Sequence, residues 1–265
     1  MQPESASFPG PRGERPWAGG CAIKRSDDSD TRVERLTRAQ PPEQGLSGTA
    51  QTLHMLCCAA AADLPASGVA ISLITESGGS GIAASSDPIS EAVEELQFTL
   101  GEGPCLDAFS SRRPVLSDDL HGAGSTRWPI YAAAATEHGV SAVFAFPLAI
   151  GNSCLGALDV YRTHTGPLAP AALAGAVSFA TYATTILLEG QEQASPDEPP
   201  PGLDDALSTR FEVHQAQGML TVQLGVGLDQ ALARLRAHAF AHGRTLVDVA
   251  RDVLDGTLLL ETDQP

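Results

Sequence analysis

Apolar residues recur at two different spacings along the chain, and the change in spacing predicts where helices and strands lie. Between residues 53 and 64 the apolar positions follow one another three or four residues apart, which predicts a helix that Ser47 caps. The runs 69–75, 140–148 and 154–162 are short, apolar and bounded by turn residues, which is typical of strands.

The remaining pattern completes a first domain over residues 46–189. Its other expected elements are a strand near 82–86 reached by a Gly-rich hairpin, a helix opened by Pro88, a short strand within 114–120, a helix over 130–139 and a long apolar helix over 170–189. Strands joined by short turns, with helices gathered around them, indicate an α+β fold built on an antiparallel sheet.

A second domain over residues 203–262 is expected to be all helical. The apolar spacing predicts helices over 203–224 and 228–242 and a third one that Thr245 caps and Gly256 ends. Such a small three-helix module buries little surface, so we expect it to gain stability by dimerising or docking.

Two stretches with few apolar residues flank these domains. Residues 1–45 combine Gly, Pro and Ser with mixed charge, which predicts a disordered leader. Residues 190–202 contain four prolines, so we expect an extended, semi-stiff linker between the domains.

Charge and cysteine content narrow the class of protein. The net charge of −16 argues against binding that depends on a general attraction to phosphates, so a nucleic-acid role must rest on a local group of arginines. The five cysteines are irregularly spaced, which favours reduced thiols in a cytoplasmic protein over disulfides. We expect no membrane span, because no run approaches 18 apolar residues.

Chemical motifs are sparse. The sequence holds no nucleotide-binding loop, nucleophile elbow or kinase motif, and the histidines do not pair with other ligands at metal spacing. We therefore expect no enzyme, no catalytic residue, no metal and no cofactor. The segment around Cys105 leaves two alternatives open, a buried small residue or a thiolate that a helix N-terminus stabilises for redox sensing.

The C-terminal domain resembles the ANTAR module, a three-helix RNA-binding domain of transcription antitermination regulators. The blocks that carry this are His214-Gln215-Ala216-Gln217-Gly218-Met219-Leu220, Ala231-Leu232-Ala233-Arg234-Leu235-Arg236-Ala237-His238-Ala239 and Leu246-Val247-Asp248-Val249-Ala250. The family commonly has Lys where this chain has Gln217. The resemblance implies a homodimer that binds stem-loop RNA in nascent transcripts.

The first domain resembles a GAF sensor domain, the kind often followed by ANTAR. This rests on Leu100-Gly101-Glu102-Gly103-Pro104-Cys105-Leu106-Asp107-Ala108, Asp119-Leu120, Arg127-Trp128-Pro129, Gly139-Val140, Phe146-Pro147-Leu148 and Gly156-Ala157-Leu158. The resemblance implies a sensor for a small-molecule or redox signal, with Glu102, Cys105 and Trp128 as candidate ligand contacts.

Several residues of the last domain are candidate RNA contacts. Arginine can reach phosphates or stack on bases, and rings can stack on splayed bases of RNA loops. The candidates are Gln217, Gly218, Arg234, Arg236, Arg244, Phe240 and His238. Gly218 is costly inside a helix and predicts a close approach by another helix or by RNA.

Two other functions fit the same pattern. One alternative is a three-helix DNA-binding repressor, which has a similar size, and the other is a protein-interaction module that binds no nucleic acid. For regulation we expect the helix over 170–189 to pack against its copy in a dimer, with Ile186 and Leu187 at the contact.

Overall fold

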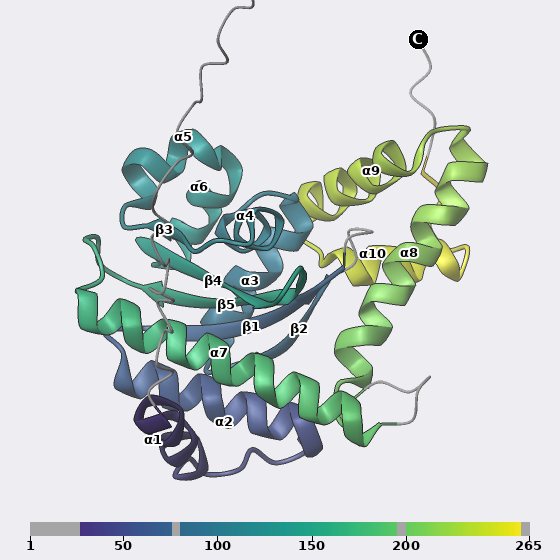
Figure 1. Cartoon of the computed structure of the whole chain (residues 1–265). Helices are drawn as coiled ribbons and strands as arrows, with labels where there is room; N and C mark the ends of the chain where they lie inside the picture. Colours follow the sequence, from purple (N-terminus) through teal and green to yellow (C-terminus); the bar gives the residue numbers. More distant parts are fainter. Residues whose placement is uncertain (1–26, 76–79, 195–199, 261–265) are drawn as a thin grey trace, which may run out of the picture.

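The computed structural model describes residues 27–75, 80–194 and 200–260, which form a three-layer sensor domain and a three-helix domain (Figure 1). The middle layer is a five-stranded antiparallel sheet in the order β2-β1-β5-β4-β3. Its strands are β1 (Gly68–Ile74), β2 (Ser80–Ser85), β3 (Val115–Ser117), β4 (Ala142–Ile150) and β5 (Ser153–Arg162). The predicted α+β fold with an antiparallel sheet is confirmed.

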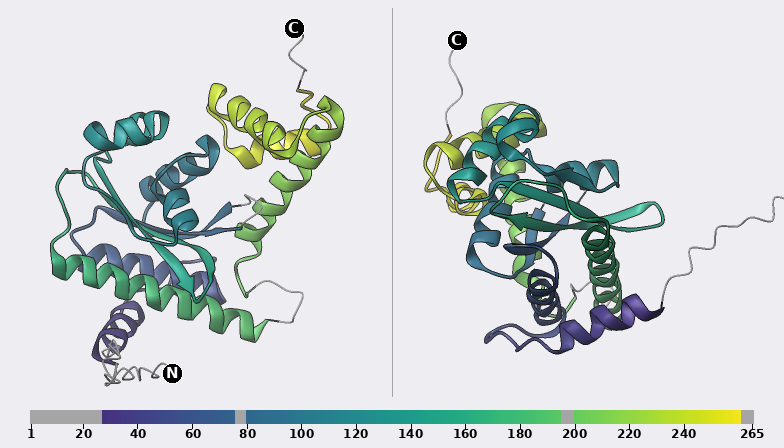
Figure 2. Two further views of the ribbon diagram at one scale, coloured as in Figure 1. Left: turned by 45° about the horizontal axis from the view of Figure 1, so that its top comes forward. Right: turned by 90° about the vertical axis from the view of Figure 1, so that its left-hand side faces the viewer.

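One face of the sheet is covered by α2 (Gly48–Asp63) and α7 (Pro170–Gln193), and α1 (Asp27–Arg38) packs on the outer side of these two helices, as Figure 2 shows from two further sides. Leu53, Leu56 and Phe179 are fully buried against sheet residues such as Ile71 and Phe144. Burying such side chains is the main favourable term in folding and keeps these helices on the sheet.

The opposite face carries α3 (Pro88–Leu100), α4 (Pro104–Ser111), the π-helical turn η1 (Leu120–Gly124), α5 (Ser125–Arg127) and α6 (Pro129–Glu137). Asp87 caps α3 by accepting hydrogen bonds from the backbone of Ile89 and Ser90, both at 3.0 Å. Gly101 ends α3 at φ 72°, a left-handed conformation that favours glycine. Together α3 and α4 cover the centre of this face of the sheet.

The second domain consists of α8 (Asp204–Leu224), α9 (Leu228–Ala241) and α10 (Leu246–Leu254), as predicted. These helices close around their own core, in which Ala216, Leu220, Leu235 and Val249 are fully buried. The Thr245 hydroxyl accepts a hydrogen bond from the backbone of Asp248 at 3.1 Å, so the predicted cap of the third helix is confirmed.

The expected disordered leader is wrong for residues 27–38, which form α1. Val33 and Thr37 are each 1% exposed, and Arg32 binds Asp63 of α2 at 2.5 Å. A few buried side chains and this ion pair hold a helix that is otherwise rich in charge. Residues 1–26 lie outside the described part of the chain.

The expected extended linker also needs correction at both ends. Helix α7 continues to Gln193, and Leu203 at the other end is 1% exposed in the core of the sensor domain. The backbone of Thr49 donates a hydrogen bond to the Pro201 carbonyl at 2.8 Å. The segment before α8 is therefore attached to α2, while residues 195–199 lie outside the described residues.

Helix α7 is long and apolar enough to cross a membrane by length and composition alone, contrary to the expectation that no segment qualifies. In this fold it packs on α2 and on the sheet, with Phe179, Ala183 and Ile186 buried. Its apolar character is thus explained by its place in the core.

Candidate functional site

A cluster of polar side chains is enclosed between the sheet and the helices α3 and α4. It contains two carboxylates, Glu94 of α3 and Asp159 of β5, together with Cys105 at the start of α4, and all three are at most 1% exposed. One ligand atom from each of the three lies within 4.8 Å of the other two. Cys105 is among the candidates predicted from the sequence, whereas the two carboxylates are not.

Gln97 holds this cluster together. Its Nε2 donates to Glu94 Oε2 at 2.9 Å and to Asp159 Oδ2 at 2.8 Å, and its Oε1 accepts from the backbone of Cys105 at 2.8 Å. Glu94 also accepts from the Ser72 hydroxyl at 2.6 Å and from the Tyr161 hydroxyl. One amide thereby fixes the relative positions of all three members.

Burial dominates the electrostatics of the cluster. It raises the pKa of Asp159 well above the ordinary value, and the nearby Glu94 raises it further. Burial also raises the pKa of the Cys105 thiol, as do the negative charges of Asp159 and Glu94. Cys105 is thus fully buried, as the first of the two alternatives predicts, and its surroundings in this structure favour the protonated thiol.

The other two candidate ligand contacts have polar partners within the protein. Glu102 Oε1 accepts from the backbone of Ile130 at 2.7 Å and of Tyr131 at 2.8 Å, so it caps the start of α6. Trp128 is 3% exposed, and its indole donates to Asp107 at 3.2 Å. Both residues fasten α6 to α4 in this structure.

The structure places Gln217 inside the second domain rather than on its surface. It is 4% exposed, and its Nε2 donates to the Leu228 carbonyl at 2.9 Å, joining α8 to the start of α9. In this conformation the side chain predicted to contact RNA is directed into the domain. At Gly218, by contrast, a Cβ would meet no described atom within 4 Å, so no helix of this chain explains the glycine.

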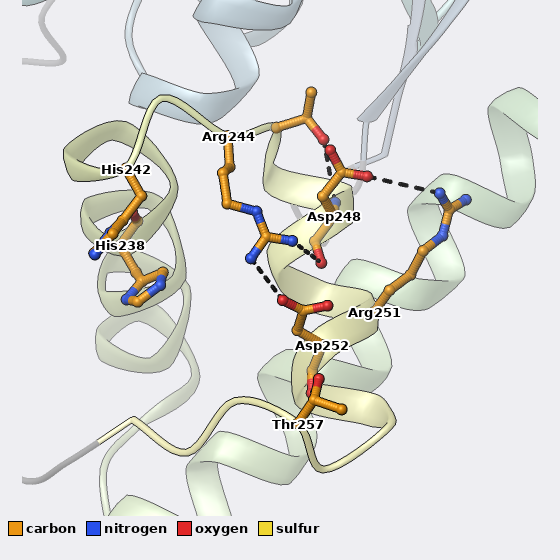
Figure 3. Close-up of polar contacts among 8 residues, drawn as sticks. His238, His242, Arg244, Asp248, Arg251, Asp252 and Thr257 are labelled. Atoms are coloured by element: carbon orange, nitrogen blue, oxygen red, sulfur yellow. Dashed lines mark hydrogen bonds and ion pairs between the residues drawn. The ribbon is translucent and has the colours of Figure 1, made fainter.

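Arg244 and its neighbours form the polar network drawn in Figure 3. Arg244 donates to Asp252 Oδ2 at 2.6 Å and to the Asp248 carbonyl at 3.2 Å, and the hydrogen bond to Asp252 raises the arginine's pKa. The rings of His238 and His242 stack at 4.0 Å beside this network. Burial and the charge of His242 lower the pKa of His238, which favours a neutral ring.

Arg236 lies at the contact between the two domains. Its Nε donates to the Phe98 carbonyl near the C-terminal end of α3 at 3.1 Å, and burial lowers its pKa. A Cβ on Gly101 would come within 2.5 Å of its guanidinium. Of the remaining candidates, Phe240 is 49% exposed and Arg234 is partly buried with a partner of its own.

The sensor also places a carboxylate at the N-terminus of α10. Glu95, next to Glu94 on α3, accepts a hydrogen bond from the backbone of Leu246, and burial raises its pKa to about 7. The flanking groove has a volume of about 460 Å³ and is lined from both domains, by Ile82, Pro88, Ala92, Glu95, Ala206, Thr245 and Val247 among others.

The edge strand β2 also contacts the second domain, at helix α8. A Cβ on Gly81 would lie 2.1 Å from the Ala206 carbonyl oxygen, so a glycine is required where the two backbones meet. Because this contact, Arg236 and Glu95 all lie on the same side of the sensor domain, they form one interface between α3–β2 and α8–α10 (Figure 1).

An exposed apolar side of α8 is absent from the sequence-based candidates. Phe211 is 72% exposed, Met219 45% and Val222 85%, and Gly218 lies among them on the same helix. The sequence contained a signal for this surface, because these residues fall outside the apolar stripe that predicts the core. Large exposed apolar groups in a row mark a surface for a partner.

The comparisons with known proteins agree with this two-domain division. A model of the GAF domain matches residues 47–188, and a model of the ANTAR domain matches residues 202–254. No curated protein matches the chain.

Solved GAF domains of two bacterial phosphoenolpyruvate-protein phosphotransferases are similar. The Acinetobacter domain is 14% identical with a TM-score of 0.48, covering 64% of this chain and 96% of its own. The Coxiella burnetii domain is 18% identical with a TM-score of 0.48, covering 63% of this chain and 94% of its own. On the match of the two domain models, the chain belongs to the GAF family, in the form of a GAF–ANTAR fusion typical of sensor-regulated antitermination regulators.

Proposed function

We propose that the ANTAR domain of this protein binds stem-loop RNA in nascent transcripts and so favours antitermination in the cytoplasm. The observation that carries this proposal is the exposed side of α8, where Phe211 and Gly218 lie about two helical turns apart on the same side and a Cβ at Gly218 would meet nothing within 4 Å. An exposed aromatic ring can stack on a base that an RNA loop splays out, and a glycine lets the backbone of a partner come close.

The charge of the module supports RNA loops over duplex DNA. Residues 204–265 carry five arginines against nine acidic residues, and Arg244 and Arg251 are paired with Asp252 and Glu212 at 2.6 and 2.9 Å. Duplex binding without sequence preference depends on neutralising many phosphates. Because few of the described cations of this module are unpaired, its binding of nucleic acid would depend more on bases stacking on its side chains.

We propose further that the sensor domain inhibits RNA binding by keeping the ANTAR domain docked. A helix N-terminus is a favourable site for phosphate, and at α10 this site is taken by the Glu95 carboxylate. Arg236, another candidate phosphate contact, donates to Phe98 of the sensor. A signal that weakens this interface frees both groups for RNA.

We propose that two protomers pack through the exposed side of α7. The residues that the sequence analysis placed at this contact are buried instead. Ile186 and Leu187 are 6% and 5% exposed in the sensor core and are not accessible to a second copy. Val177 is 45% exposed, and Thr181 and Thr185 follow it on the same side of the helix. These small residues permit close helix packing between two protomers.

The RNA proposal is tested by titrating the full chain, and residues 203–265 alone, with a fluorescent RNA hairpin and with duplex DNA of matched length. We expect tighter binding of the hairpin, with the shorter piece binding more tightly than the full chain. Equal affinity for DNA would favour a DNA-binding repressor, and no binding of either would favour a protein-interaction module.

A further inference from the structure

The buried cluster of the sensor core has the composition of a metal site. Glu94, Cys105 and Asp159 offer two carboxylates and one sulfur, with their ligand atoms within 4.8 Å of one another. Ligand atoms bound tetrahedrally to one ion at about 2.0–2.3 Å are roughly 3.3–3.8 Å apart, so small side-chain rotations would bring the three atoms onto one ion. We propose that these three residues bind a divalent transition-metal ion inside the GAF domain.

A second observation points to a ligand at the same place. Asp159 Oδ1 and the Tyr131 hydroxyl are buried without a hydrogen-bond partner among the described residues. Tyr131 is fully buried and lies near enough to Asp159, Glu94 and Cys105 for their charges to act on it. Buried polar atoms are nearly always satisfied, and a metal ion with its bound water would satisfy both.

A cation would neutralise the negative charge of the cluster. In the part of the chain that the structure describes, the ion pairs include neither Glu94 nor Asp159. Two carboxylates in a dry interior repel each other unless one of them is protonated or a positive charge compensates them. A divalent ion supplies this charge and allows Cys105 to bind as thiolate, with its proton released to solvent.

The ligand types select the class of metal. Mg²⁺ and Ca²⁺ prefer oxygen ligands alone, whereas a thiolate beside two carboxylates suits Zn²⁺, Fe²⁺ or Co²⁺. Gln97 then acts as the outer-sphere residue, because it contacts all three ligand residues at 2.8–2.9 Å. With three protein ligands, one position of a tetrahedral ion stays open toward a small molecule.

The position of the site on α3 connects it with regulation. Glu94 faces the cluster, and the next residue, Glu95, contacts the N-terminus of α10. An ion that repositions Glu94 therefore acts on the helix that carries the interface with the ANTAR domain.

The test is a titration of the chelator-treated, reduced full chain with Co²⁺, followed by the thiolate-to-cobalt absorption band, and then displacement by Zn²⁺. We expect saturation at one equivalent per chain. Cys105→Ser should abolish the band, Asp159→Asn should weaken binding at least tenfold, and Gln97→Ala should weaken it about 10- to 100-fold.

Matched controls separate the site from other thiols and carboxylates. Cys154→Ser on β5 and Glu91→Gln, an exposed residue one turn earlier on α3, should bind Co²⁺ as the wild type does. Circular dichroism checks each fold, and Cys105→Ala replaces the serine variant if the latter unfolds. A wild type without a saturable band, or a band that persists when Cys105 is replaced, would overturn the proposal.

Discussion

Arg236 of α9 donates a hydrogen bond from Nε to the carbonyl oxygen of Phe98 on α3, at 3.1 Å. This contact joins a residue that the sequence assigns to RNA binding with the end of a sensor helix. Under the proposed function, Arg236 becomes accessible to an RNA phosphate when the ANTAR domain separates from the sensor. Docking and RNA binding would then compete, and the sensor would act on the ANTAR domain without any chemistry of its own.

The first prediction concerns the exposed ring on α8. Phe211→Ala should weaken binding of an RNA hairpin about tenfold or more, because stacking of a base on an aromatic ring is worth roughly 1–3 kcal/mol. Anisotropy titration measures this. Leu259→Ala removes a side chain that is also 72% exposed and should leave RNA affinity unchanged. Equal effects of the two substitutions would argue against stacking on Phe211.

Gln217 should contribute to stability rather than to RNA contact. Gln217→Ala removes the hydrogen bond to the Leu228 carbonyl and should lower the free energy of unfolding by about 1 kcal/mol. Urea unfolding measures this change. Gln217→Lys should not strengthen hairpin binding, since the side chain points into the domain. A steeper salt dependence of RNA binding in the lysine variant would place this position at the RNA after all.

Two positions on α7 should respond differently to a charge. Ile186→Asp should destabilise the sensor by at least about 3 kcal/mol, because it removes buried apolar contacts and buries a carboxylate. Val177→Asp lies on the exposed side and should change stability by less than about 0.5 kcal/mol. Thermal unfolding distinguishes these effects.

The same pair tests dimerisation through α7. Sedimentation of the folded Val177→Asp variant should show weaker self-association than the wild type. An unchanged dimer would exclude this side of α7 as the contact.

Glu102 should behave as a helix cap. Glu102→Ala removes the acceptor for the backbone of Ile130 and Tyr131 and should cost about 1–2 kcal/mol of stability. Chemical denaturation with a probe of the sensor domain measures the loss. If stability is unchanged while ligand binding is lost, Glu102 is a ligand contact instead.

The fold could be predicted where burial leaves a clear pattern. In β4 and β5 nearly continuous apolar runs are buried, and the apolar stripe of α2 faces the sheet. Helix α1 was missed because, among its described side chains, Val33, Leu36 and Thr37 face the core while many of the others are charged, so its composition is typical of disorder.

The candidate site was predictable only in part. Cys105 was named, but Glu94 lies beside Glu91 and Glu95 in a stretch that looks like the solvated side of a helix. Its partner Asp159 comes from a strand 65 residues further along the chain, and the two meet only in the folded domain, where Gln97 of α3 donates to both. The contact between Glu95 and α10 likewise could not be predicted, because it joins two domains and the spacing of apolar residues within one segment carries no information about it.

The central claim, that docking on the sensor inhibits RNA binding, is tested most directly at Gly81. Its alanine Cβ would lie 2.1 Å from the Ala206 carbonyl, so Gly81→Ala should separate β2 from α8 without altering the ANTAR surface. In hairpin titrations of the full chain we expect about 5-fold or greater tightening, the range of a 1–3 kcal/mol coupling. Gly227→Ala, where a Cβ meets nothing, should bind as the wild type does. Unchanged or weaker hairpin affinity in folded Gly81→Ala protein would contradict the account.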